Sequence, residues 1–316
     1  MKVLPLAADS LGVRSMATYV EVGDTGILCD PGATLAPSRF NLPPADEEWE
    51  ALRRANDRIS AYAARAAFVF VSHYHDDHFR SDPASYTGRT VLLKDPRRMV
   101  NGVQARRGTE LMTALAPHAR RELADGYELR EPTLTLRVSP PLAHGTEGTT
   151  FGYVVALTVV DPAERARFVF ASDVQGPLSP VATAYLIQER PTLLYLSGPP
   201  SYLERELGRA TIDRGVDNLR RILEATGCRV VFDHHALRDA HPEERFARLW
   251  ETGRVVTAAG HLGLADARLE SQRGVLWAAA RKPAVKAGTP RATIRTDRAT
   301  SAGIVRARSA KGGDRA

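Results

Sequence analysis

The sequence is poor in cysteine and in aromatic residues, and it has no long apolar run. Its 316 residues include two cysteines, Cys29 and Cys228, and 7% aromatic side chains. So few cysteines exclude a disulfide scaffold and predict a reducing, cytoplasmic setting. The longest apolar run, residues 151–160, is well short of the roughly 18–20 residues of a membrane span, and no signal-peptide pattern opens the chain. We therefore expect no membrane partner.

Charge is unevenly distributed along the chain. The net charge is +6, but residues 281–316 contain ten basic and two acidic residues, which leaves residues 1–280 close to neutral. The basic segment has no apolar period with which to join a core. We expect a folded domain over 1–280 and a basic, disordered tail over 281–316, either as a solvated extension or in weak, salt-sensitive contact with RNA or DNA.

Residues 1–280 have the patterns of a sheet covered by helices. Apolar and β-branched runs predict strands at 3–7, 16–22, 27–30, 67–71, 90–93, 134–138, 153–159, 168–171, 193–196, 230–232 and 255–257. Helical spacing predicts helices at 46–66, 109–119, 180–189, 214–225 and 242–251. Strands dominate early and alternate with helices later, which favours an α/β fold over an all-β barrel.

The densest group of chemically active residues follows the predicted strand at 67–71. The segment Ser72-His-Tyr-His-Asp-Asp-His-Phe79 contains His73, His75, Asp77 and His78. Imidazole nitrogens and carboxylate oxygens are zinc ligands, and a loop at a strand end can direct several of them inward. Surface histidines in a polar loop are the alternative, but three of the chain's nine histidines lie within residues 73–78. The segment therefore predicts a site for one or two metal ions.

The motif H-x-H-x-D-H after an apolar strand resembles the signature of the metallo-β-lactamase superfamily. Other parts of that pattern are matched before and after the motif. Asp30 follows an early strand; after the motif come His144 in Leu142-Ala-His-Gly145, Asp173 in Phe170-Ala-Ser-Asp173 and a last histidine in Asp233-His-His235. The segments 11–15, 94–96, 197–203 and 233–239 are similar to a largely uncharacterised, mainly archaeal family of this superfamily, over about residues 1–280.

This resemblance implies a four-layer αβ/βα sandwich with two divalent metal ions, zinc first and iron or manganese as alternatives. It assigns His73, His75 and His144 to one ion. It assigns Asp77, His78 and either His234 or His235 to the other, with Asp173 bridging the two. Asp30 is expected to orient a ligand by hydrogen bonding.

Two adjacent histidines compete for the last ligand position. His234 is followed four residues later by Arg238, the spacing of the tRNA 3′-processing branch of the superfamily. We therefore choose His234 as the ligand. The other histidine, His235, would contact substrate, form a hydrogen bond or simply pack, and Arg238 is expected near the substrate.

The resemblance implies a hydrolase in which two metal ions generate hydroxide and Asp77 or Asp173 orients it and carries its proton. A phosphodiester in a nucleotide or nucleic acid is the first substrate expected, because of Arg238 and the basic residues at 94–98 and 106–107. The alternative is a small ester, thioester or lactone, because the compact body has no obvious nucleic-acid surface. Asp173 and His234 are only 61 positions apart, too few for the large inserted domain of the superfamily's RNA and DNA processing enzymes. A metal-holding scaffold without catalysis is a further alternative, and a flavodiiron-type oxidoreductase is disfavoured since no flavin domain follows. The oligomeric state is left open.

Overall fold

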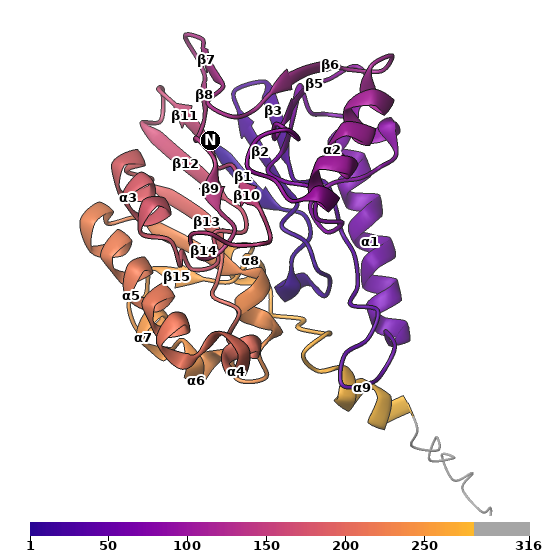
Figure 1. The fold of residues 1–316 in the computed structure, drawn as a ribbon, viewed down its shortest axis with the longest axis vertical. Coiled ribbons are helices and arrows are strands. Elements are labelled where there is room, and N and C mark those ends of the chain that lie inside the picture. The colour runs from indigo at the N-terminus through magenta and orange to yellow at the C-terminus, as the bar shows by residue number, and fades with distance from the viewer. Residues whose placement is uncertain (281–316) are drawn as a thin grey trace, which may run out of the picture. The chain divides into compact units, whose positions relative to one another are not determined.

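The computed structural model describes residues 1–280, which form one compact unit built on two sheets. The first sheet has six strands in the order β1-β2-β3-β4-β5-β6, and the second has seven in the order β15-β14-β13-β12-β11-β8-β7. Figure 1 shows α1 and α2 beside the first sheet and α3, α5 and α7 beside the second. The predictions made for 281–316 lie outside the described residues.

The strands of the first sheet are β1 (Lys2–Pro5), β2 (Thr18–Val22), β3 (Thr25–Cys29), β4 (Phe68–Val71), β5 (Thr90–Leu93) and β6 (Arg120–Leu123). Those of the second sheet are β7 (Glu128–Arg130), β8 (Thr135–Val138), β11 (Leu157–Asp161), β12 (Ala166–Ala171), β13 (Leu193–Ser197), β14 (Arg229–Asp233) and β15 (Val255–Val256). A short pair joins β9 (Leu142–Ala143) to β10 (Tyr153–Val154).

The helices are α1 (Asp46–Ala63), α2 (Gly102–Leu115), α3 (Pro180–Glu189), α4 (Glu204–Leu207), α5 (Arg209–Thr226), α6 (Pro242–Arg245), α7 (Ala247–Trp250), α8 (Ala258–His261) and α9 (Arg273–Ala280). The start of α3 illustrates the local rules: Ser179 caps it by accepting a hydrogen bond from the Ala182 backbone, and Pro180 occupies the first turn. Among these helices none is long and apolar enough to cross a lipid bilayer.

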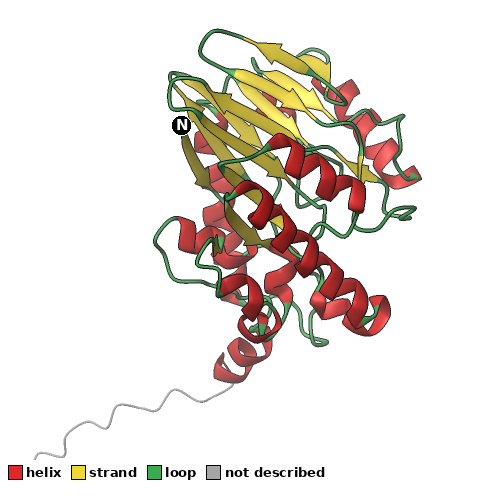
Figure 2. Ribbon diagram, turned by 90° about the vertical axis from the view of Figure 1, so that its left-hand side faces the viewer, coloured by secondary structure: helices red, strands yellow, loops and turns green. Residues whose placement is uncertain are grey.

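Three apolar layers hold the sandwich together. Phe70 of β4 and Phe170 of β12 meet between the two sheets, with ring centroids 6.3 Å apart at 89°. Val69 and Val71 point the other way and pack with Ile59 of α1, while Val169 on the second sheet packs toward α3 and α5. Strand side chains alternate between faces, so a continuous apolar run such as 67–71 reflects burial on both faces. The expected four-layer αβ/βα sandwich is confirmed (Figure 2).

The sequence patterns miss or misplace a few elements. The run 153–159, predicted as one strand, divides into β10 and β11, because the Val155 backbone donates a hydrogen bond to the Ser72 carbonyl between the two pairings. The polar strand β6 lies at a sheet edge with mostly exposed side chains, so it lacks the apolar alternation of an inner strand. Helix α2 begins seven residues earlier than the apolar spacing predicts, at an Asn101 cap.

The topology gathers several strand ends at one place. Strands β3 and β4 are parallel neighbours in the first sheet, and β12, β13 and β14 are parallel neighbours in the second. The carboxyl ends of parallel neighbours lie at the same sheet edge, which is where α/β folds place their ligands. The residues that follow these strands therefore face a common region between the two sheets.

Candidate metal centre

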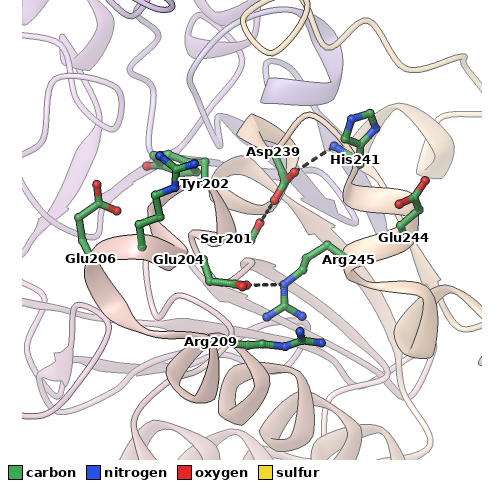
Figure 3. Close-up of a pocket in the computed structure, with 10 residues that line it drawn as sticks. Ser201, Tyr202, Glu204, Glu206, Arg209, Asp239, His241, Glu244 and Arg245 are labelled. Carbon is green, nitrogen blue, oxygen red and sulfur yellow. Dashed lines mark hydrogen bonds and ion pairs between the residues drawn. The ribbon is translucent and has the colours of Figure 1, made fainter.

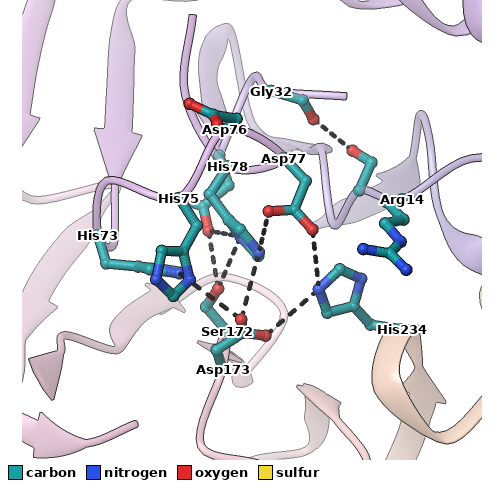
Figure 4. Close-up of polar contacts among 12 residues, drawn as sticks. Arg14, Gly32, His73, His75, Asp76, Asp77, His78, Ser172, Asp173 and His234 are labelled. Carbon is teal, nitrogen blue, oxygen red and sulfur yellow. Dashed lines mark hydrogen bonds and ion pairs between the residues drawn. The ribbon is translucent and has the colours of Figure 1, made fainter. Parts of the chain in front are cut away.

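The candidate ligands come from loops that directly follow these strands. His73, His75, Asp77 and His78 follow β4, Asp173 follows β12, and His234 follows β14. Figure 4 shows His73, His78, Asp77 and His234 arranged around Asp173. His144, in the loop after β9, completes the group, with Nε2 3.1 Å from Asp173 Oδ2. The structure thus brings together all seven predicted ligands.

Backbone geometry explains how the two sheets present so many side chains to one point. Asp30 and His234 have positive φ angles of 44° and 61°, which bend the chain sharply as it leaves β3 and β14. Behind the first bend, a Cβ on Gly32 would lie 2.4 Å from the Phe79 amide nitrogen and 2.6 Å from that of His78. Position 32 therefore has room only for glycine beside the loop that carries His78.

The first ligand group contains His73, His75, His144 and Asp173. The ring atoms His73 Nε2 and His75 Nδ1 are 3.1 Å apart, and His73 Nε2 is 3.6 Å from Asp173 Oδ2. Atoms that each lie about 2.0–2.2 Å from one tetrahedral ion are separated by roughly 3.3–3.6 Å. The spacing in this group suits a single divalent ion.

The second ligand group contains Asp77, His78 and His234, and it shares Asp173 with the first. His78 Nε2 lies 3.7 Å from Asp77 Oδ1 and 3.4 Å from Asp173 Oδ2. His234 Nε2 lies 3.5 Å from an oxygen of each of these carboxylates. Because Asp173 Oδ1 faces His234 and Oδ2 faces His144, one carboxylate reaches both groups.

In three of the histidines, the second ring nitrogen is held by a fixed partner outside the centre. His73 Nδ1 lies 2.9 Å from Ser72 Oγ, His78 Nδ1 lies 2.9 Å from Asp30 Oδ2, and His234 Nδ1 lies 2.8 Å from Asp9 Oδ2. Such partners fix the orientation and tautomer of metal-binding imidazoles. Asp30 also accepts hydrogen bonds from the hydroxyls of Ser72 and Ser172, and so joins β3, β4 and β12.

Burial and mutual charge set the protonation of the cluster. Burial lowers the pKa of His75 to about 4, with His144 adding to the effect. Burial alone would raise the pKa of Asp173, but the imidazoles of His235, His78 and His234 hold it well below its ordinary value. A neutral imidazole and an ionised carboxylate are the forms that bind metals.

Two buried atoms at the centre test whether metal ions fit. His78 Nε2 and Asp173 Oδ1 are inaccessible to water and make no hydrogen bond to any described residue. Leaving buried polar atoms unpaired costs about 1–3 kcal/mol each. Each atom lies within 3.5 Å of another predicted ligand atom, so a divalent cation bound by these residues would satisfy both. The donor set is one that zinc, iron or manganese accepts.

The adjacent histidines differ in their surroundings. The His234 ring is fully buried, whereas His235 lines a cavity above the centre and its Nδ1 lies 3.1 Å from Gln175 Nε2. The two rings stack with centroids 4.6 Å apart, and His235 Nε2 is still 3.7 Å from Asp173 Oδ2. The structure places both rings near Asp173, and only His234 is within 4 Å of Asp77 as well.

Asp9 is the principal site residue that sequence reasoning missed. It lies in a 3-10 turn near the start of the chain (Asp9–Leu11) and accepts hydrogen bonds from His234 Nδ1 and from Arg238 Nε. Burial alone would raise the pKa of Asp9, but the charges of Arg238 and His234 lower it. No local pattern marks this residue, because its partners lie more than 220 positions away.

We expect Asp9→Asn to weaken retention of the ion held by the second ligand group by about 10–100-fold, the usual cost of losing a carboxylate behind a ligating histidine. The amide keeps the shape but removes the charge that faces Nδ1 of His234. Competition with a chelator measures the affinity. Asp24→Asn, in an exposed turn, is the matched control, and equal affinities in the two variants would contradict the role.

The basic residues expected to meet phosphate lie elsewhere. Lys94 is fully buried and donates a hydrogen bond to Asp125 at 2.8 Å, so it holds the loop after β5 rather than a ligand. Arg107 is paired with Asp76 and with the Tyr74 carbonyl. The guanidinium groups that do line the cavity are those of Arg14 and Arg238.

Comparison with known proteins identifies the family. The chain is 39% identical over 287 residues to a UPF0282 protein of Thermococcus gammatolerans, covering 86% of this chain and 94% of the relative. The chain belongs to the UPF0282 family. A UPF0282 protein of Methanopyrus kandleri is 37% identical, with 87% of this chain and 99% of the relative covered. The archaeal family expected from the motifs is thereby confirmed, while none of the protein-family models compared with the chain matches it.

Solved structures with a similar fold include members of the superfamily that the motifs resemble. Tm1679, described as a metal-dependent hydrolase of the β-lactamase superfamily, is 14% identical with a TM-score of 0.48, covering 81% of this chain and 94% of its own. Unliganded yeast PDE1 gives a TM-score of 0.45 at 10% identity, covering 81% and 97%. The short form of human tRNase Z gives 0.43 at 14% identity, covering 74% and 92%. The UPF0282 chain itself is a sandwich of two sheets covered by helices, with a cluster of His and Asp residues able to bind metal ions.

Proposed function

We propose that the protein is a hydrolase that uses two divalent metal ions, zinc first, to cleave an anionic ester, with a phosphodiester as the first candidate. One observation carries the proposal: two ligand groups that share Asp173 lie at the floor of a cavity of about 450 Å³. A cavity of this size holds a small molecule. His73, His75 and His144 would bind one ion and Asp77, His78 and His234 the other.

Divalent ions held by these residues would lower the pKa of water, so that hydroxide is available near neutral pH, and would stabilise negative charge on the ester oxygen. The surrounding residues supply orientation and proton handling. Asp77 reaches the cavity and lies 3.3 Å from Arg238 and 3.5 Å from His234, so its Oδ2 is placed to hold or pass a proton. Asp173 is the second residue to which the proposal assigns orientation of the water and transfer of its proton.

Arg238 supports the phosphodiester over an uncharged ester. Its side chain is buried at the cavity and bound to Asp9, which fixes the guanidinium beside the metal ligands. A fixed guanidinium matches the charge and shape of a phosphoryl group. The apolar residues that line the same cavity favour the second candidate, a small ester, thioester or lactone.

We expect close to two metal ions per chain in the purified protein. Replacing both His73 and His75 by alanine removes two of four ligands from the first group and should reduce the content to about one ion. Elemental analysis gives the content, and turnover of bis(p-nitrophenyl) phosphate, a thioester and a lactone on the same sample gives the reaction class.

The matched control replaces His118 and His241, which are exposed and lie outside both groups, by alanine. Metal content unchanged in the His73 and His75 variant, or lost equally in the control, would contradict the assignment. Two ions bound without turnover of any of the three ester classes would favour a metal-holding scaffold instead.

A further inference from the structure

The cavity above the metal centre is chemically divided. On the side of the first ligand group, the Phe151 ring packs against His144 with centroids 5.6 Å apart. On the side of the second group, Arg238 contacts Asp77 and His234. The ligands of the two proposed ions therefore border an apolar surface at one end of the cavity and a guanidinium at the other.

Other apolar side chains also line the cavity. They come from the segment before α3, the segment after β13 and helix α4: Leu178, Pro200, Leu203 and Leu207. Phe151 is 54% exposed, and Leu207 is also exposed. Exposed apolar side chains at a polar cavity offer surface that an apolar group of a ligand can cover.

The polar end contains two guanidinium groups, each held by a carboxylate. Arg14 and Arg238 both line the cavity; Glu270 binds Arg14 through two contacts of 2.6 Å, and Asp9 binds Arg238. Two divalent ions carry more positive charge than the two carboxylates that face them, Asp77 and Asp173. The floor of the loaded cavity is therefore cationic.

The hollow beside the cavity is unsuited to a long nucleic acid. It measures about 870 Å³ and shares Tyr202 and Glu206 with the cavity (Figure 3). Its carboxylates outnumber its arginines, since it is lined by Glu204, Glu206, Asp239 and Glu244 but only by Arg205, Arg209 and Arg245. Arg245 is already paired with Glu204 and Asp213. A polynucleotide needs a track of unopposed cations along its phosphates.

From this division we infer that the site takes a small anionic ester with one apolar or aromatic group. The anionic ester group lies at the metal ions and Arg238, and the apolar group lies against Phe151. This inference rests on the proposed function and narrows its substrate to a small molecule with two unlike ends.

Binding of two phosphonates to the metal-loaded full-length protein tests the inference without requiring turnover. Phenylphosphonate and methylphosphonate carry the same anionic group, and only the first has a ring to bury. We expect phenylphosphonate to bind at least about tenfold more tightly by calorimetry, because burial of the ring removes apolar surface from water. Phe151→Ala should reduce this ratio to threefold or less and leave methylphosphonate binding unchanged.

Phe40→Ala is the matched control, since Phe40 is 53% exposed and is not among the residues lining the cavity. Equal affinity for the two phosphonates in the unaltered protein, or the same ratio after Phe151→Ala, would overturn the inference even if phosphodiesters are hydrolysed. Faster cleavage of a 20-nucleotide RNA than of phenyl p-nitrophenyl phosphate would also overturn it. Selective phosphonate binding without ester hydrolysis would support the divided cavity and refute only the proposed reaction.

Discussion

His234→Ala is expected to lose one metal ion and more than about 100-fold of the turnover, since even a residue behind a ligand costs 10–100-fold. The His234 ring is fully buried, is held by Asp9, and reaches both Asp77 and Asp173 at 3.5 Å. Among the described residues, His78 is the other imidazole within 4 Å of both Asp77 and Asp173, and it already belongs to the same group. No further imidazole is therefore placed to replace His234. Metal analysis and turnover of a phosphodiester measure the two effects.

His235→Ala is the matched variant one residue away. Its ring lies on the cavity wall and is held by Gln175, so we expect both ions to remain and the change to fall on KM more than on kcat. If His235→Ala instead lost an ion and His234→Ala kept both, the ligand would be His235 and the spacing to Arg238 would have misled the assignment.

Glu48→Gln is expected to lower the free energy of unfolding by about 3–5 kcal/mol, because it leaves a buried arginine without its counter-charge. Glu48 in the first turn of α1 binds Arg273 at the start of α9 through two contacts of 2.7 and 2.8 Å, and both side chains are buried. Arg273 also donates hydrogen bonds to the carbonyls of Ala36 and Leu42, so it cannot move out to solvent without breaking these.

Glu47→Gln, one residue earlier and exposed, is the control, and it should change stability by less than about 0.5 kcal/mol. Urea unfolding of the metal-loaded protein, followed by circular dichroism, gives both values at one pH. A loss below 1 kcal/mol for Glu48→Gln would show that the buried pair is replaceable by a neutral hydrogen bond.

Local patterns were sufficient for the features that depend on neighbouring residues. The run at 67–71 predicts a strand buried on both faces, and β4 lies between two sheet neighbours with Phe70 in the central layer. The H-x-H-x-D-H motif follows that strand directly, so the position of its histidines at a sheet edge was also accessible from the sequence. Helix α3 starts and ends where the helical spacing predicts.

The remaining features depend on residues that are distant in the sequence. Lys94 looked like a phosphate ligand because the chain around it is basic, but its charge is used by Asp125, which is 31 positions away. Asp9 and Gln175 hold His234 and His235 through side-chain contacts that follow from sheet packing rather than from spacing. A single sequence reports periodicity and motif order, whereas the partner of each buried polar group is decided by the fold.

The contacts between the two ends of the described chain have a consequence for the order of assembly. Asp9 meets His234, Arg14 meets Glu270 and Glu48 meets Arg273, with sequence separations of 225 to 256 residues. During synthesis the amino-terminal sheet emerges first, together with His73, His75, Asp77 and His78, while His234 and its neighbours follow much later. Contacts of such long range close slowly, because loop entropy is lost before they form. The second ligand group is therefore completed late in folding, and a ribosome-bound chain that ends before residue 234 lacks one of its side chains.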